Sequence, residues 1–272
     1  MGSRLEARRL IEAASGWEGA ELARGLGDPA PERARRRLVE MTGRRRAGEP
    51  LQYVVGSWSF RRLDLMVDRR VLIPRPETEV VVEVALGELR RLGARPGPPP
   101  VVVDLGTGSG AIALALASEG QPAQVWATDS SAGALAVARA NLAGVGGTAA
   151  TRVRLAEGSW YGALPSELAG VVDLVVSNPP YVAESDEIEP EVAGWEPPGA
   201  LWSGPTGLEA STEILSGAPG WLRRPGAVVL EVAPQRAAAT AARARAAGFA
   251  VSVHPDLAGR DRVLVGRLPE GE

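Results

Sequence analysis

Between residues 101 and 265 short apolar runs alternate with helical segments, and this alternation constrains the fold most. Helices are expected over residues 111–117, 132–142 and 235–247. Strands are expected over residues 101–103, 124–127, 153–156, 171–176, 227–232, 249–254 and 262–265. This order predicts an α/β fold with an open, mostly parallel sheet and helices on both faces. Ligands of such sheets bind at the carboxyl ends of strands.

Composition restricts the chemistry. The chain has 272 residues, enough for one or two domains, and 45% of them are apolar, which supports a sizeable core. It has no Cys and one His, His254, so thiolate chemistry is excluded, and neither a multi-His metal site nor a His-dependent triad is expected. The net charge of −3 argues against a broad nucleic-acid surface. With no signal peptide or membrane span in the sequence, we expect a cytoplasmic protein.

The first part of the chain has a different character. Residues 3–48 have apolar positions at roughly helical spacing, and they carry eleven Arg against seven acidic residues. This surface is either a docking site for an acidic or RNA-containing partner or the solvated side of a small helical bundle. In residues 50–73, the apolar runs predict short strands or a hairpin, and the first of these runs is Tyr53-Val54-Val55-Gly56. Thr78 is expected to cap a helix over residues 79–92.

A glycine-rich turn, Asp104-Leu105-Gly106-Thr107-Gly108-Ser109-Gly110, follows the first strand of the sheet. Glycines let the backbone approach a ligand closely. The spacing is neither that of dinucleotide binders nor that of a P-loop. Asp104 would repel a pyrophosphate and favour a ligand that carries positive charge.

The next two strands end in further candidates. Asp129 can accept both hydroxyls of a ribose, or it can cap the following helix. Trp160 can pack against an adenine ring, or it can belong to the core.

The strand over residues 171–176 leads into Ser177-Asn178-Pro179-Pro180-Tyr181. Two consecutive prolines stiffen the turn, and Pro179 favours an extended Asn178. The turn presents a carboxamide, backbone carbonyls and an aromatic ring, which together suit a planar group that carries NH2. The alternative is an ordinary strand-ending turn.

Together, the glycine turn, Asp129 and Asn178-Pro179-Pro180-Tyr181 resemble the class I methyltransferases that act on planar nitrogens. Ile73-Pro74-Arg75-Pro76-Glu77-Thr78-Glu79 and the N-terminal region narrow the resemblance to the protein-(glutamine-N5) methyltransferases of bacterial peptide chain release factors. The resemblance implies a Rossmann-like sheet with an antiparallel final strand. It divides the chain into an N-terminal helical substrate-docking domain (1–49), a β-hairpin linker (50–75) and an S-adenosylmethionine-dependent methyltransferase domain (76–272).

The resemblance also implies a reaction, in which a methyl group passes from S-adenosylmethionine to the side-chain amide nitrogen of the glutamine in a Gly-Gly-Gln motif. The product is S-adenosylhomocysteine. A cytoplasmic monomer with a release factor as partner is expected, without membrane or nucleic acid. The implied catalytic and substrate-holding turn is Asn178, Pro179, Pro180 and Tyr181. The implied cofactor residues are Asp104, Gly106, Thr107, Gly108, Ser109, Gly110, Asp129, Trp160 and Asn178. The family commonly has Asp where this chain has Ser159, so Glu157 is a candidate replacement.

Three questions stay open beside this interpretation. Arg75 and Glu77 either line the substrate entrance or form a loop salt bridge. Residues 182–205 form either a substrate-facing lid or a packed loop. The rival functions are an adenine-N6 methyltransferase acting on DNA or RNA and a non-catalytic cofactor-binding module. His254 is expected to play no part in catalysis.

Overall fold

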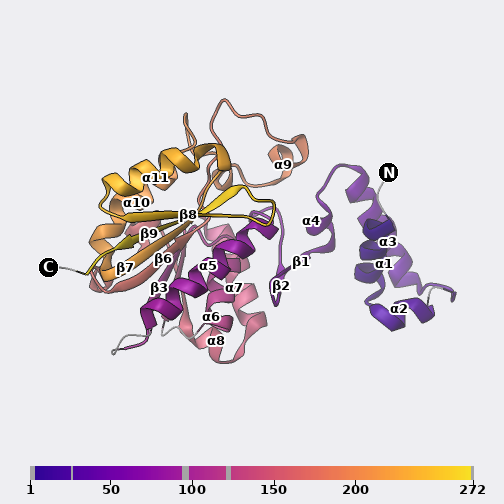
Figure 1. Ribbon diagram of the computed structural model, residues 1–272. Coiled ribbons are helices and arrows are strands. Elements are labelled where there is room, and N and C mark those ends of the chain that lie inside the picture. The colour runs from indigo at the N-terminus through magenta and orange to yellow at the C-terminus, as the bar shows by residue number, and fades with distance from the viewer. Residues whose placement is uncertain (1–3, 26, 94–97, 121–123, 271–272) are drawn as a thin grey trace.

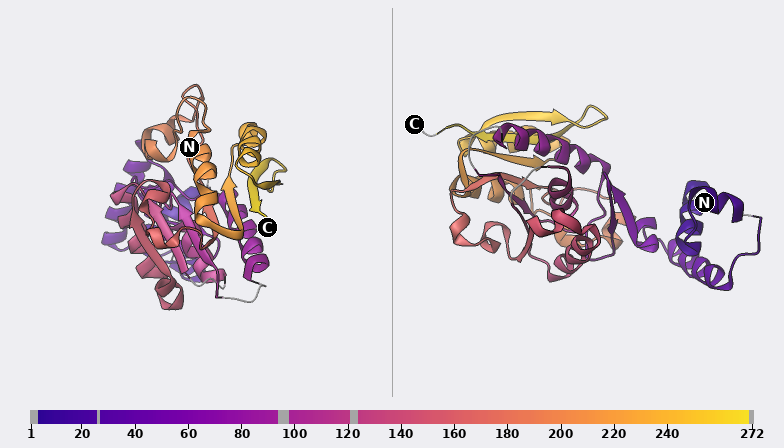
Figure 2. Two further views of the ribbon diagram at one scale, coloured as in Figure 1. Left: turned by 90° about the vertical axis from the view of Figure 1, so that its left-hand side faces the viewer. Right: turned by 90° about the horizontal axis from the view of Figure 1, so that it is seen from below.

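The computed structural model describes residues 4–25, 27–93, 98–120 and 124–270, so the outer ends of the first and last predicted domains lie outside the described residues. The N-terminal helices are α1 (Arg4–Ser15), α2 (Gly19–Gly25), α3 (Glu32–Arg46) and α4 (Leu51–Val55). Helices α1, α3 and α4 pack around a small apolar cluster made of Leu10, Ala14, Met41 and Val54. This helical region lies beyond one end of the sheet and is joined to it by α4 and a hairpin (Figures 1 and 2).

The prediction of a strand at Tyr53-Val54-Val55-Gly56 was wrong, because these residues form α4 and its end. Gly56 adopts the left-handed conformation (φ 86°) that terminates helices, and its N–H donates to the Gln52 carbonyl. Tertiary contacts override the β preference of the two valines: Tyr53 and Val54 are buried, and the Tyr53 hydroxyl donates to the Val71 carbonyl.

The expected hairpin is confirmed one turn later, as β1 (Ser57–Phe60) and β2 (Leu63–Met66). It is fastened to the main domain by a side chain of α7 (Ala132–Val145). The Asn141 carboxamide accepts from the Met66 N–H at 2.7 Å and donates to the Met66 carbonyl at 3.0 Å.

The expected sheet is confirmed, with its seven strands in the order β5-β4-β3-β6-β7-β9-β8. Their bounds are β3 (Val101–Leu105), β4 (Gln124–Asp129), β5 (Val153–Glu157), β6 (Val172–Ser177), β7 (Leu222–Glu231), β8 (Ala250–Pro255) and β9 (Asp261–Leu268). Strands β3 to β7 pair in parallel, and the final strand, β9, is antiparallel to both β7 and β8. The strand order reverses between β3 and β6, and a crevice for a ligand forms where such a sheet changes direction.

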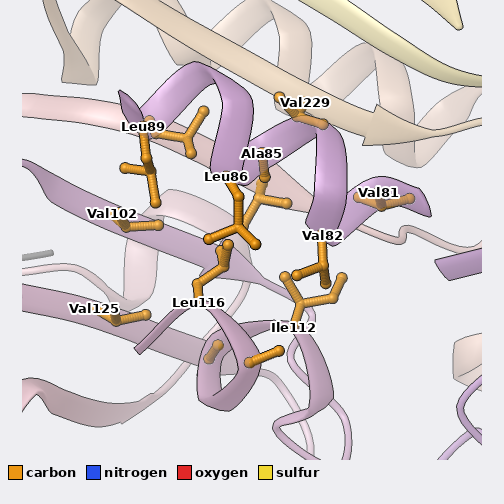
Figure 3. Close-up of a cluster of buried hydrophobic side chains, with 14 of the residues drawn as sticks. Val81, Val82, Ala85, Leu86, Leu89, Val102, Ile112, Leu116, Val125 and Val229 are labelled. Atoms are coloured by element: carbon orange, nitrogen blue, oxygen red, sulfur yellow. The ribbon is translucent and has the colours of Figure 1, made fainter. Parts of the chain in front are cut away.

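Helices cover both faces of the sheet (Figure 1). One face carries α5 (Pro76–Gly93), α6 (Ala111–Glu119), α7 and α8 (Gly147–Arg152), and the other carries α10 (Glu209–Trp221) and α11 (Ala237–Ala246). Figure 3 shows Val82, Leu86 and Leu89 of α5 directed at Ile112 and Leu116 of α6 and at the sheet. Burying such side chains stabilises the fold by roughly 1.5–3 kcal/mol each.

Two helices differ from those expected. Helix α5 begins at Pro76 because proline is already set for a first helical position, so Thr78 lies inside the first turn and is not the cap. Helix α10 was not predicted, since Gly217, Pro219 and Gly220 obscure its pattern. Within the described residues, no helix combines the length and apolar character needed to cross a bilayer.

Candidate active site

A cavity of about 360 Å³ opens where the strand order reverses, at the carboxyl ends of β3 to β6. Its volume lies within the range of small-molecule sites. The predicted site residues that line this cavity are Arg75, Gly106, Thr107, Gly108, Ser109, Asp129, Trp160, Asn178 and Pro180. The predicted residues Glu77, Asp104, Gly110, Pro179 and Tyr181 are not in the lining.

The glycine loop meets the cavity with its backbone. Gly106, Gly108 and Gly110 all have left-handed φ angles, 72°, 55° and 86°. A Cβ added to Gly108 would meet no atom within 4 Å and would project into open space. The Gly108 N–H donates to Asp129 Oδ2 at 2.9 Å, and the Thr107 N–H donates to the Thr128 carbonyl at 2.8 Å. The loop is therefore fixed to the end of β4.

Asp104 lies behind this loop. Its carboxyl is fully buried, and its Oδ2 accepts from Thr107 Oγ1 at 2.6 Å and from the Ala113 N–H at 3.1 Å, while Oδ1 has no partner among the described residues. Burial raises the pKa of Asp104 to about 7. Asp104 thus holds the loop to the first turn of α6.

Asp129 faces the cavity from the end of β4. Its Oδ1 accepts from the Ser131 N–H, and its Oδ2 accepts from the Gly108 N–H, both at 2.9 Å. A carboxylate has about four acceptor positions, so each oxygen can still accept a hydroxyl. The alternative role as helix cap falls to Ser131, whose hydroxyl accepts from the Ala134 N–H at the start of α7.

Trp160 follows β5 and lies over the glycine loop, 3.6 Å from the position of a Cβ built on Gly106. Its φ of 43° is unusual for a bulky residue and indicates a strained position of the kind that collects at functional sites. Ser159 also lines the cavity, whereas Glu157 is exposed and is not in the lining.

The Asn178 turn closes the opposite side. Ser177, at the end of β6, donates its hydroxyl to the Leu105 carbonyl at 2.6 Å, which ties the turn to the start of the glycine loop. Asn178 Nδ2 donates to Thr78 Oγ1 at 3.2 Å, and the Tyr181 hydroxyl donates to Glu231 Oε1 at 3.4 Å. Burial is the main reason why the pKa of Tyr181 is raised.

Arg75 and Glu77 do not pair with each other. Arg75 lines the cavity and forms an ion pair with Glu196, which is 3% exposed and also accepts from the Ile73 N–H. Glu77 lies outside the lining and pairs with Arg260 at 3.3 Å. The two residues therefore belong to separate ion pairs.

Residues 182–205 contribute Pro197, Gly199 and Ala200 to the lining. The segment contains the short helix α9 (Pro190–Trp195), and a bridge between Val182 and Trp202 closes the loop on itself. Glu191 of α9 also pairs with Arg45 of α3 at 3.2 Å. The segment thus contacts both the cavity and the N-terminal helices.

The sequence did not single out Glu196 or Glu231 as site residues. Glu231 ends the apolar run of β7 and is 1% exposed, and a lone acid at the end of a buried strand is the signal that could have revealed it.

The fold and this site define a class I methyltransferase. S-adenosylmethionine fits the residues present: Gly108 leaves room for a ligand, Asp129 retains acceptors for a diol, and Trp160 supplies a ring. A structure titled as a methyltransferase from Pyrococcus furiosus has the same fold, with a TM-score of 0.54 and 19% identity over 85% of this chain and 98% of that one.

Comparison of sequences gives the family. Residues 92–193 match the family described as methyltransferase small domain, and residues 2–56 match the PrmC N-terminal domain. A release factor glutamine methyltransferase of Cereibacter sphaeroides is 42% identical over 97% of this chain and 91% of its own length. Its counterpart in Burkholderia pseudomallei is 41% identical over 97% of this chain and 92% of its own. The chain belongs to the release factor glutamine methyltransferases.

Proposed function

We propose that this chain transfers a methyl group from S-adenosylmethionine to the side-chain amide nitrogen, N5, of the glutamine in the Gly-Gly-Gln motif of peptide chain release factors. One observation carries the proposal: a single cavity is lined by the glycine loop and Asp129 on one side and by Asn178 on the other. Family membership supplies the identity of the acceptor. A release factor substrate implies action in the cytoplasm.

In this proposal, Gly106 to Ser109, Asp129 and Trp160 hold the cofactor. Asp129 accepts the ribose hydroxyls, and Trp160 packs against the adenine. When bound, S-adenosylmethionine supplies an electrophilic methyl group on a sulfonium. Ser159 offers only a hydroxyl where the family commonly has a carboxylate.

The Asn178 turn would hold the acceptor. An amide nitrogen is a poor nucleophile because its lone pair is delocalised into the carbonyl. Asn178 Oδ1 and the Pro179 carbonyl would accept the two N–H bonds of the substrate amide, which fixes its orientation and stabilises positive charge on nitrogen. No strong general base is needed, because the proton can leave after methyl transfer. The packing of Tyr181 on the amide stays a prediction, since Tyr181 lies outside the cavity lining.

We propose further that residues 1–49 dock the release factor. The arginines of α3 that are exposed are Arg33, Arg35, Arg36, Arg37 and Arg46. An acidic surface on the partner would be drawn to them, and the contact would weaken at high salt.

The test is incubation of the enzyme with purified release factor and S-adenosylmethionine, followed by peptide mass mapping. We expect a gain of one methyl group on the glutamine of the Gly-Gly-Gln loop. A parallel reaction offers DNA as acceptor, and methylation of DNA alone would favour the rival nucleic-acid function. Cofactor binding without transfer to either acceptor would favour the non-catalytic module.

A further inference from the structure

Glu231 is a buried carboxylate beside the Asn178 turn, and the reaction described above leaves it without a role. Strands β6 and β7 pair so that Ser177 is opposite Leu230, which places Glu231 next to Asn178 along the sheet. Each of its oxygens accepts one hydroxyl. Oε2 accepts from Thr78 at 2.6 Å, and Oε1 accepts from Tyr181 at 3.4 Å. Glu231 therefore contacts Tyr181 directly and is linked to Asn178 through Thr78.

The hydrogen bonds form a chain with a direction. Thr78 has a single hydroxyl hydrogen, and it donates that hydrogen to Oε2 of Glu231. The hydrogen of Thr78 is therefore used by Glu231, and Thr78 Oγ1 can only accept from its other neighbour. That neighbour is Asn178, which presents Nδ2 to Thr78 at 3.2 Å. Since the oxygen and nitrogen of a carboxamide lie on opposite sides, Asn178 Oδ1 is left for the cavity.

We propose that Glu231 and Thr78 are positioning residues that fix the carboxamide of Asn178 with its oxygen toward the substrate amide. The inference rests on the proposed function, because the orientation matters only if Asn178 accepts an N–H from the acceptor. A reversed Asn178 would place its own N–H groups against those of the substrate. It would also place Oδ1 against a Thr78 oxygen that has no hydrogen to give, so both contacts would be lost.

The hydrogen bond from Thr78 to Oε2 does not require Glu231 to be ionised, because Oε2 remains an acceptor when the neutral acid carries its proton on Oε1. On balance the pKa of Glu231 is raised, chiefly by burial and further by the Glu77 carboxylate on α5, while the hydroxyls of Thr78 and Tyr181 and the guanidinium of Arg262 on β9 offset part of this rise. Thr78 is itself 4% exposed, so water does not compete freely for its hydroxyl. A buried hydroxyl that lost Glu231 would turn to Asn178 Oδ1, because an unpaired buried donor is costly.

The first variants alter Thr78. Thr78→Val removes the hydroxyl, and we expect kcat to fall about tenfold or more, while the Kd for S-adenosylmethionine, measured by calorimetry, stays within about twofold. Thr78→Ser keeps the hydroxyl and should restore most of the turnover. An unchanged kcat in Thr78→Val, or an equal loss in Thr78→Ser, would overturn the proposal.

The second set alters Glu231. Glu231→Met should lower kcat about tenfold or more, because the hydrogen of Thr78 is then free to occupy Asn178 Oδ1. The double variant Thr78→Val/Glu231→Met should have a kcat close to that of Thr78→Val alone, since Glu231 acts on the Asn178 carboxamide through Thr78 and its bond to Tyr181 is long, 3.4 Å. Losses that multiply in the double variant would contradict this. Glu88→Met is the matched control. Glu88 is a buried carboxylate like Glu231, but it lies on α5 and pairs with Arg267 and Arg91. Its loss should therefore lower the Tm and leave kcat unchanged.

A readout independent of turnover separates this inference from the proposed function. The side-chain NH2 resonance of Asn178, assigned by its absence in Asn178→Ala, should be protected from hydrogen exchange in the wild type and lose that protection in Thr78→Val. If the wild-type enzyme methylates no release factor, the proposed function fails whatever these spectra show. If it does methylate and the Asn178 NH2 is equally unprotected in both proteins, the positioning chain fails alone.

Discussion

The two ends of the cavity are built by different means. At the proposed cofactor end, the glycine loop presents backbone to the cavity, and the carboxylate that faces the cavity beside it, Asp129, lies 21 residues from Gly108. At the acceptor end, the turn depends on side chains from distant segments: Thr78 is 100 residues from Asn178 and 153 from Glu231. A site made of backbone atoms keeps its geometry when nearby side chains are replaced. A series of side-chain hydrogen bonds is broken when any one of its residues is replaced. Substitutions at the first end should act mainly on affinity, and those at the second mainly on turnover.

The largest effect is expected for Asn178→Ala. Removing the proposed acceptor of a substrate N–H should lower kcat by about 100- to 1,000-fold, the loss seen when one hydrogen-bonding group of a reacting centre is deleted. The Kd for S-adenosylmethionine should change by no more than about threefold. Single-turnover methylation and calorimetry measure the two quantities, and near-normal turnover would remove the mechanism.

Asp129→Ala probes the other end. Loss of hydrogen bonds to a charged group should raise the Kd for S-adenosylmethionine by about 10- to 100-fold. At saturating cofactor, kcat should fall far less. Glu157→Ala is the matched control, because Glu157 is opposite Asp129 at the end of β5 but is not in the lining. Equal losses in both variants would show that the effect is not specific to the cavity.

A smaller effect is expected for Gly207→Ala, because the added methyl group would collide with the backbone of the Asn178 turn at Tyr181. Gly207 has a φ of 72°, and an added Cβ would lie 2.5 Å from the Tyr181 carbonyl oxygen. Displacing the turn should lower kcat roughly tenfold, with little change in cofactor affinity. Gly16→Ala controls for backbone strain, since Gly16 has a φ of 78° and no atom within 4 Å of an added Cβ. Matching kinetics in the two variants would contradict the prediction.

The same contrast explains what could be predicted from the sequence. The glycine loop, Asp129 and Asn178 lie at ends of apolar runs, and each is recognisable from its neighbours in the chain. The positions of Thr78, Glu196 and Glu231 depend on contacts between segments more than 100 residues apart, which local patterns do not contain. For the same reason α4 was mistaken for a strand: the burial of Tyr53 and Val54 outweighs the β preference of its valines.

Helix α9 has a mechanical consequence. Glu191 of the helix is ion-paired to α3, and Glu196, just beyond its last residue, is ion-paired to Arg75 at the cavity. Six helical residues span about 9 Å, so α9 and its two ion pairs link the N-terminal helices to the cavity. If the N-terminal helices dock a protein as proposed, a displacement of α3 would be passed through these two ion pairs to the rim of the cavity.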